Sequence, residues 1–299
     1  SNGGNLVSKL NKEYTTHHKL PVNSKNFVYY PIIAKKISNY IKKNKINIIH
    51  VRSRAPAWIT YFLPQNNFKT VSTFHNVYSG KTFLKKFYNK RMANMNFIIA
   101  ISEYVKNEIS KKYKIDINKI HVINRGIDTD FFKDNITDNE KKIFKTKHNI
   151  YNDQKIILYP GRITDWKGQY KFLSIVEKLN TKKFVVLFAG DTSNISHTSF
   201  LKKKIKEKNL IDKCKILGKL NDYELKVAYS LSDIVLSLPK RAEGFGRTIS
   251  ETLSMKKIIL AKNIGGAFDQ LKYQDNLHKI NDRDFDQLND KIMNILFLP

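Results

Sequence analysis

Residues 155–168 read KIILYPGRITDWKG, and this stretch decides the fold class. Residues 155–160 form a short apolar run, which is typical of a buried strand. Gly161 then supplies a turn, and apolar residues recur at helical spacing over 167–179. A buried strand, a short turn and a helix make up the repeating unit of a parallel α/β sheet.

The same alternation of strand and helix runs through both halves of the chain. Further strands are predicted at 47–51, 70–74, 97–101, 120–123, 184–189, 214–217, 233–238 and 257–261. Further helices are predicted at 31–43, 102–113, 199–208, 222–229 and 248–255. Such alternation gives parallel sheets with right-handed crossovers.

Two such halves predict an α/β protein with two doubly wound domains that face each other. We expect the first domain at 1–135, a polar linker at 136–152 and the second domain at 153–299. Ligands of doubly wound sheets bind beyond the carboxyl ends of the strands. We therefore expect the functional site in the cleft between the domains.

The composition suits two packed cores and a reducing compartment. The chain has 299 residues, of which 41% are hydrophobic, enough for two domains of about 150 residues. Cys214 is the only cysteine and lies in an apolar run, so we expect a packing residue and neither a disulfide nor a cysteine zinc site. We predict a cytoplasmic protein, since no apolar stretch approaches the ~18 residues of a membrane span and no signal peptide opens the chain.

The net charge is strongly positive. The sequence holds 54 basic and 26 acidic side chains, which gives a formal charge of +28. Such a charge attracts polyanions, including nucleic acid, an anionic membrane surface and phosphate-bearing substrates. The abundance of Lys, Asn and Ile is equally typical of an AT-rich genome, so the charge alone does not identify a partner.

The turn after the strand at 155–160 carries two cations. Gly161 is followed by Arg162, which we expect to project from the carboxyl end of the sheet, and Lys167 is expected at the start of the next helix. A guanidinium and an ammonium around one turn suit a diphosphate. The alternative is that both are ordinary surface cations of a lysine-rich protein.

Residues 243–251, EGFGRTISE, join a predicted strand to a predicted helix through two glycines. A helix N-terminus reached through a glycine loop binds phosphate. Carboxylates at Glu243 and Glu251 beside an anion site suit the hydroxyls of a sugar or a ribose. A capping loop with one helix-dipole glutamate and one solvated glutamate remains the alternative. The donor-binding candidates between these glutamates are Phe245, Gly246, Arg247 and Thr248.

Two weaker signals also follow predicted strands. Gly265 and Gly266 come after the strand at 257–261, where their amides could touch a donor or simply form a turn. His75 comes after the strand at 70–74, where an imidazole could hydrogen-bond a sugar or pair with phosphate. A lone histidine is more often structural.

The segment 51–58, VRSRAPAW, follows the strand at 47–51. Arg52, Arg54 and Trp58 suit an acceptor that is anionic or a carbohydrate, although Pro56 also fits the first turn of an ordinary helix. The sequence lacks a Walker A loop, a Gly-x-Ser-x-Gly elbow and a His-Glu-x-x-His pair. His17 and His18 are adjacent and lack the spacing of helical metal ligands, so we expect no metal site.

Together these segments resemble glycosyltransferase family 4, the retaining enzymes of the GT-B fold, with two facing Rossmann-like domains. The similar segments occur in order along nearly the whole chain at 52–58, 73–76, 124–128, 160–168 and 243–251. The last is similar to the family's Glu-x7-Glu signature. The arginine-rich segment and the Trp-Lys-Gly at 166–168 look most like bacterial enzymes of lipopolysaccharide or surface-glycan assembly.

The resemblance implies a retaining hexosyltransferase that uses a nucleotide-diphosphate sugar as donor and a glycan or lipid-linked acceptor. Arg162 and Lys167 would hold the diphosphate, Glu243 would contact the transferred sugar and Glu251 would bind the ribose. Phe245 and Gly246 would offer backbone amides, and His75 would approach the donor sugar. The leaving phosphate would accept the acceptor's proton, so neither a metal nor another cofactor is expected.

The pattern departs from that of the family at both ends. We expect the chain to begin about one strand–helix unit later than family members do, and to lack their closing C-terminal helix.

The segment 81–92, KTFLKKFYNKRM, mixes five cations with apolar side chains. We expect this segment to contact the anionic inner face of a membrane, with a helix packed on its own domain as the alternative.

Three other functions remain open. A nucleotide-sugar epimerase could share the fold without transferring sugar to an acceptor. A shortened, catalytically silent relative could serve as a partner subunit. Nucleic-acid binding is suggested only by the charge, and without an aromatic RNA-binding signature or a helix-turn-helix pattern we expect no nucleic-acid partner.

Overall fold

The computed structural model describes residues 3–4, 7–10, 14–24, 26–64, 68–80, 82–179, 181, 183–275, 278–281, 285 and 287–297. The chain divides into two compact units, Ser1–Asn124 and Arg125–Pro299. Each unit contains one sheet whose neighbouring strands are parallel, as the strand–helix alternation predicts.

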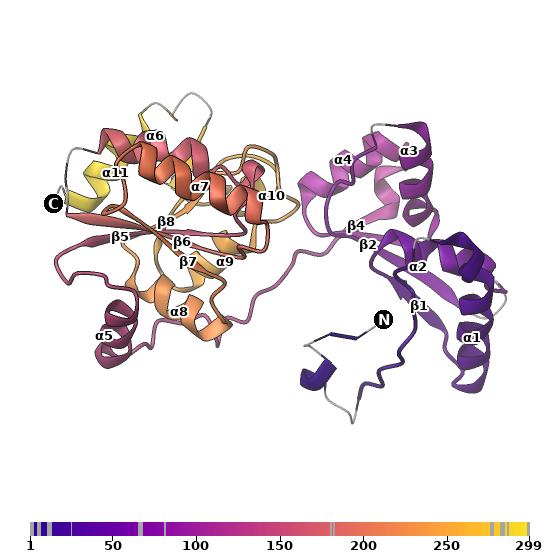
Figure 1. Cartoon of the computed structure of the whole chain (residues 1–299). Coiled ribbons are helices and arrows are strands. Elements are labelled where there is room, and N and C mark those ends of the chain that lie inside the picture. Colours follow the sequence, from indigo (N-terminus) through magenta and orange to yellow (C-terminus); the bar gives the residue numbers. More distant parts are fainter. Residues whose placement is uncertain are drawn as a thin grey trace. The chain divides into compact units, whose positions relative to one another are not determined.

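The first unit has a sheet with the strand order β1-β2-β3-β4. Its elements have the colours of the indigo end of the bar in Figure 1. The strands are β1 Ile48–Val51, β2 Lys69–Phe74, β3 Phe97–Ala100 and β4 Ile120–Val122. The α-helices are α1 Tyr30–Lys43, α2 Arg54–Ile59, α3 Phe83–Lys90 and α4 Glu103–Tyr113. The short 3-10 helices are η1 Val7–Lys9, η2 Phe27–Tyr29, η3 Thr60–Phe62, η4 Arg91–Asn94 and η5 Ile117–Lys119.

Helix α4 shows how the sequence fixes these elements. The Ser102 side chain accepts a hydrogen bond from the Val105 amide and so caps the first turn, as predicted. Val105 and Ile109 are one turn apart and both are fully buried. The predicted helix at 102–113 is therefore confirmed, with its serine as the cap.

The second unit has a sheet with the strand order β10-β9-β8-β5-β6-β7. The strands are β5 Lys155–Pro160, β6 Phe184–Ala189, β7 Cys214–Gly218, β8 Ile234–Ser237, β9 Ile258–Lys262 and β10 Lys279–Ile280. The helices are α5 Asp138–Lys147, η6 Asp165–Lys167, α6 Gln169–Lys178, α7 Ile195–Glu207, α8 Asp222–Leu231, α9 Arg247–Ser254, α10 Gly266–Leu271 and α11 Leu288–Phe297.

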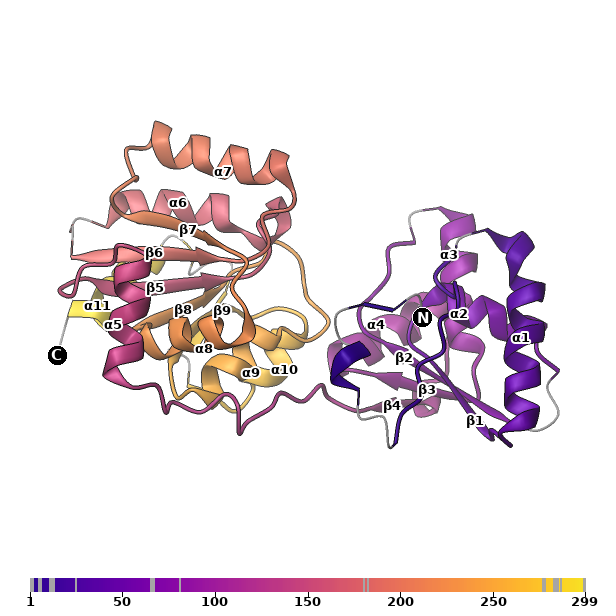
Figure 2. The same ribbon diagram turned by 60° about the horizontal axis from the view of Figure 1, so that its bottom comes forward.

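Helices cover both faces of the second sheet, because its central strands are apolar on both sides. In β5, Ile157 and Tyr159 pack with α6, α7 and α11, whereas Ile156 and Leu158 pack with α5, α8, α9 and α10. Figures 1 and 2 show α6 and α7 on one side of the sheet and α8 and α9 on the other. Cys214 is buried in the first of these cores as a packing residue, and its burial raises the thiol pKa to about 12.

The segment predicted as a linker, 136–152, differs from a linker in the structure. Residues 138–147 form helix α5, and Ile136, Phe144 and Ile150 pack into the core of the second unit. Thr137 and Glu140 form a reciprocal capping box at the start of this helix. The boundary between the units lies after Asn124 instead.

Candidate functional site

The strand order of the second sheet reverses between β5 and β8. From β5 the chain moves outward to β6 and β7, and it then returns to place β8 on the other side of β5. Ligands of open α/β sheets bind beyond the carboxyl ends of the strands at such a reversal. The candidate segments 161–168 and 243–251 follow β5 and β8. The topology therefore brings both segments to the place where a ligand is expected.

The loop after β5 is held by close backbone contacts. Gly161 has φ +136°, and its amide donates to the Ala189 carbonyl at 2.8 Å. A Cβ on Gly190 would lie only 1.9 Å from the Gly161 carbonyl oxygen, so the loops after β5 and β6 touch backbone to backbone. The fully buried Gln169 donates from Nε2 to the Arg162 carbonyl at 3.1 Å. These contacts fix the backbone from which the exposed Arg162 side chain projects.

Lys167 links the two candidate segments through an ion pair. Its ammonium contacts the Glu243 carboxylate, and the two side chains are 16% and 18% exposed. A Cβ on Gly161 would lie 3.5 Å from Lys167 Cε, so the lysine stem lies along the glycine. Lys167 lies in η6 rather than at the start of α6, because Gly168, with φ +87°, separates the two. A cation and a carboxylate therefore lie together at the reversal of strand order.

Helix α9 begins at Arg247, directly after Gly246, which has φ +87°. The preceding loop is anchored by Gln270, whose side-chain amide donates to the Phe245 and Gly246 carbonyls. Phe245 is itself buried, with Thr248 half-buried in the first turn of the helix. The helix N-terminus thus lies at the carboxyl edge of the sheet, where its dipole favours an anion.

Glu251 is a buried carboxylate one turn into α9. Its Oε2 accepts a hydrogen bond from the Tyr229 hydroxyl at 2.9 Å, and its Oε1 lies 2.8 Å from a guanidinium nitrogen of Arg247. Burial raises the pKa of Glu251 above the usual glutamate value, while Tyr229 and Arg247 lower it in part. Burial likewise raises the pKa of Tyr229, so its hydroxyl keeps its proton and donates a hydrogen bond to the carboxylate. This arrangement presents an oriented acceptor.

A pocket of about 220 Å³ lies beside Glu251. It is lined by the carboxyl ends of β5 and β6, the loop after β7 and the first turns of α9, and Gly161, Tyr229 and Thr248 form part of its wall. Glycine backbone, a helix N-terminus and one buried carboxylate thus surround a single hollow. Such a hollow suits a molecule with both hydroxyls and phosphates.

Gly265 and Gly266 lie beside Glu243 in a way that the sequence does not predict. Gly265 pairs with Glu243 in a β-bridge, and the Gly266 amide donates to the Glu243 carbonyl at 2.9 Å. A Cβ on Gly266 would lie 2.5 Å from the carbonyl oxygen of Gly244. Gly266 therefore allows two loops to approach closely, and its predicted contact with a donor stays a prediction.

In the first unit, His75 and Arg52 lie at the carboxyl ends of β2 and β1. The Arg52 Nε donates to His75 Nε2 at 3.2 Å. This contact requires a lone pair on Nε2, so in this arrangement the imidazole carries its proton on Nδ1. His75 thus presents a defined tautomer beside a guanidinium.

Arg54 and Trp58 face the side chains around α3. The Arg54 guanidinium donates to Asn89 Oδ1 at 3.2 Å and lies 4.6 Å from the centre of the Tyr78 ring. Trp58 donates from Nε1 to the Tyr88 carbonyl at 2.9 Å and stacks on the Tyr88 ring. Of the three predicted acceptor-side residues, Arg52 therefore contacts His75. Arg54 and Trp58 instead contact residues of α3 and the loop before it.

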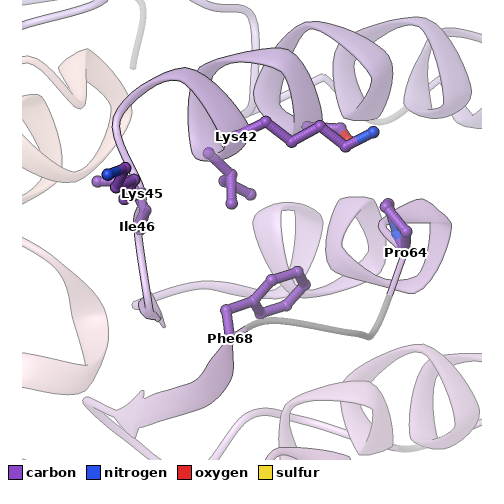
Figure 3. Close-up of a pocket in the computed structure, with 7 residues that line it drawn as sticks. Lys42, Lys45, Ile46, Pro64 and Phe68 are labelled. Carbon is purple, nitrogen blue, oxygen red and sulfur yellow. The ribbon is translucent and has the colours of Figure 1, made fainter.

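Two of the hollows in the first unit lie beside its helices. One has a volume of about 500 Å³ and lies between the end of α1 and the start of β2, where Lys42, Lys45 and Phe68 line it (Figure 3). The other, which we name the aromatic groove, has a volume of about 690 Å³. The aromatic groove is lined by Phe27, Trp58, Tyr61, Leu84, Lys85, Phe87, Tyr88, Lys90, Arg91 and Asn94.

Within the described part of the chain, no three His, Cys, Asp or Glu side chains are grouped so that they could hold a metal ion. None of the helices formed by those residues has the length and apolar character needed to cross a membrane.

Comparison with known protein families covers both units. The family model of glycosyl transferases group 1 matches residues 140–298, more than half of the chain, and that of Glycosyltransferase Family 4 matches residues 5–131. A solved glycosyltransferase from Rickettsia africae is 36% identical, with a TM-score of 0.85 over 98% of this chain and 78% of its own.

More distant similarities include a solved structure and a curated sequence. The Anabaena protein HepE, solved in complex with UDP-glucose, is 17% identical, with a TM-score of 0.75 over 88% of this chain and 72% of its own. A capsular polysaccharide biosynthesis glycosyltransferase, CapM of Staphylococcus aureus, is 24% identical over 67% of this chain and 52% of its own. The chain spans about half the length of the first curated relatives that it matches. The predicted GT-B fold with two Rossmann-like domains is confirmed.

Proposed function

Because this chain belongs to the group 1 glycosyltransferases, we propose that it transfers a hexose-type sugar from a nucleoside-diphosphate donor to a glycan or glycolipid acceptor. One observation carries the proposal. At the reversal between β5 and β8, two cation–carboxylate pairs, Lys167 with Glu243 and Arg247 with Glu251, lie beside a helix N-terminus. A nucleotide sugar carries the complementary groups, namely two phosphates and two sets of hydroxyls.

Each side chain then has a role that follows from its chemistry. Arg162 and Lys167 bind the donor diphosphate and stabilise the charge that develops on the leaving group. Glu243 accepts hydrogen bonds from the transferred sugar, and Glu251 accepts them from the ribose. The N-terminus of α9, with Phe245, Gly246 and Thr248, faces the phosphates.

The proposed reaction retains the configuration of the anomeric carbon. The acceptor hydroxyl oxygen forms its bond to that carbon on the face from which the diphosphate leaves, and the departing phosphate oxygen takes the hydroxyl proton. Lys167 and Arg162 supply the positive charge that the leaving group needs, so the reaction as proposed requires no metal ion. His75 and Arg52, paired in the first unit, contact the transferred sugar and the acceptor.

We place this activity in the assembly of a lipopolysaccharide or another surface polysaccharide. The support is that one relative is named for capsular polysaccharide biosynthesis, and that the sequence around Arg52 and Trp166 resembles such enzymes. The buried single cysteine is compatible with a reducing compartment, so we place the reaction in the cytoplasm.

Thermal unfolding in the presence of UDP, GDP, ADP, CMP and their common sugar conjugates tests the donor site. A ligand at 100 times its dissociation constant adds about 2.7 kcal/mol to the free energy of unfolding. We expect one diphosphate family to stabilise the wild type, and Arg162→Ala and Glu251→Ala to lose most of that stabilisation. Lys202→Ala, on the far helix α7, is the matched control and should keep it.

The matching sugar donor, incubated with and without candidate acceptors, then tests transfer. Formation of a glycosidic product supports the proposal, and its anomeric configuration tests retention. Release of an epimerised nucleotide sugar without any acceptor would point to an epimerase instead. If no nucleotide changes the unfolding temperature of the wild type, the donor site is refuted.

A further inference from the structure

The aromatic groove continues onto an exposed apolar surface of α3. Three apolar side chains of this short helix are exposed: Phe83 by 81%, Leu84 by 77% and Phe87 by 57%. Tyr61 and Phe27, which also line the groove, are exposed as well. Contiguous apolar surface of this kind on a folded unit marks a binding surface, because it is otherwise left in contact with water.

Cations surround this surface and carboxylates are absent from the sequence around it. From Tyr14 to Ser102 the sequence contains 15 lysines and arginines and no aspartate or glutamate. The first 124 residues hold 22 basic and 4 acidic side chains, so they carry +18 of the total charge of +28. Lys85 and Lys90 line the groove itself, and Lys86 is exposed on the same helix. The exposed apolar side chains of α3 are therefore interleaved with lysines on a unit that is itself strongly positive.

An anionic lipid bilayer matches both properties. Its phosphates pair with the lysines, while its acyl boundary accepts aromatic and aliphatic side chains. A second copy of this chain fits poorly, because a symmetric contact would bring the same lysines against one another. Nucleic acid would use the cations and aromatic rings, but Leu84 offers no ring on which a base could stack.

We propose that the aromatic groove and α3 form a docking surface for an anionic phospholipid bilayer. Phe83, Leu84 and Phe87 enter the boundary between head groups and acyl chains, and Lys85, Lys86 and Lys90 contact the phosphates. This proposal stands apart from the proposed transfer reaction, because lipid binding can be measured without a donor or an acceptor.

Co-sedimentation with vesicles provides the first test. We expect the protein to bind vesicles of phosphatidylcholine and phosphatidylglycerol, to bind pure phosphatidylcholine weakly, and to dissociate as the salt concentration rises. Lys85→Glu/Lys90→Glu should weaken binding by roughly 30-fold or more, since each basic residue near an anionic surface contributes about fivefold. Leu84→Ser should weaken binding by roughly tenfold.

Helix α7 offers matched controls. Ile195, 78% exposed in its first turn, corresponds to Leu84, and the exposed Lys202 and Lys206 correspond to the lysines of α3. Ile195→Ser and Lys202→Glu/Lys206→Glu should bind vesicles like the wild type. If they weaken binding as much as the α3 variants, or if the α3 variants bind normally, the proposal is wrong.

Trp58 provides a test that does not depend on a loss of binding. The chain has two tryptophans, so Trp166→Phe leaves Trp58 as the fluorophore. Brominated lipids should quench Trp58 in anionic vesicles, because it lines the groove. Sedimentation of this variant without quenching would overturn the proposal. So would a single-stranded oligonucleotide that binds through Lys85 and Lys90 while vesicle binding survives their reversal.

Discussion

Replacing Tyr229 with phenylalanine tests the buried carboxylate of the donor site. The Tyr229 hydroxyl donates to Glu251 Oε2 at 2.9 Å, and both side chains are buried. Phenylalanine keeps the ring and removes only this donor. A hydrogen bond to an ionised group contributes roughly 1.5–3 kcal/mol, so the carboxylate becomes easier to protonate and the pKa of Glu251 rises further.

The expected loss of affinity depends on pH. Protonation of Glu251 removes an acceptor for the ribose hydroxyls, so nucleotide affinity falls as pH falls through the pKa of Glu251. Well above that pKa, Tyr229→Phe and the wild type should bind almost equally. Below the pKa values of both proteins, the variant should bind roughly 10- to 100-fold more weakly, which corresponds to the lost hydrogen bond.

Isothermal titration calorimetry with the stabilising nucleoside diphosphate, at pH values above and below the pKa of Glu251, measures this change in affinity. Tyr223→Phe is the matched control, because Tyr223 lies on the same helix and its hydroxyl also contacts a glutamate, Glu140, which lies outside the pocket. The control should follow the wild-type profile. If Tyr229→Phe loses the same nucleotide affinity at every pH, or loses none, Glu251 does not bind the nucleotide as an ionised acceptor.

Three further predictions concern the same unit. Gly190→Ala should lower the free energy of unfolding by roughly 2 kcal/mol or more, because its Cβ would lie 1.9 Å from a carbonyl oxygen. Gly126→Ala is the control, since its Cβ would meet open space, and denaturant unfolding should give it nearly the wild-type free energy. Lys167→Ala should lower kcat by roughly 10²–10³ in the transfer assay and leave Glu243 without its cation; an unchanged kcat would remove Lys167 from catalysis. Cys214, whose burial raises its pKa to about 12, should react with a thiol reagent only as the unit unfolds, so labelling faster than unfolding would contradict its burial.

Patterns of apolar residues predicted the fold well, because strands that are buried on both faces of a sheet appear in the sequence as short continuous apolar runs. The strands at 155–160 and 184–189 have the predicted bounds. Helix α5 was missed because its apolar pattern is weak, with Phe144 as the residue that it buries. The sequence did hold one signal for it, the Thr137 and Glu140 pair of a capping box.

The candidate site was predicted less completely, because contacts between distant segments are absent from local patterns. The segments after β5 and β8 were found from their glycines and charges. The partners that hold them, Gln169, Gln270 and Tyr229, were missed because each lies in a helix that otherwise reads as an ordinary amphipathic pattern. The hydrogen bond from the Gly266 amide to the Glu243 carbonyl was also missed, because a glycine after a strand does not indicate a partner so far away in the sequence.

The return of β8 to β5 has a consequence for the synthesis of the protein. Ile157 pairs with Val186 across 29 residues, but with Ile234 across 77, and closing the longer loop costs about 1 kcal/mol more in chain entropy. A nascent chain can therefore align β5, β6 and β7 before β8 and the following segment with Glu243 and Glu251 have left the ribosome. The proposed nucleotide pocket lacks the wall that holds Thr248 and Glu251 until translation passes α9, so its ligand can assist only the last stage of folding.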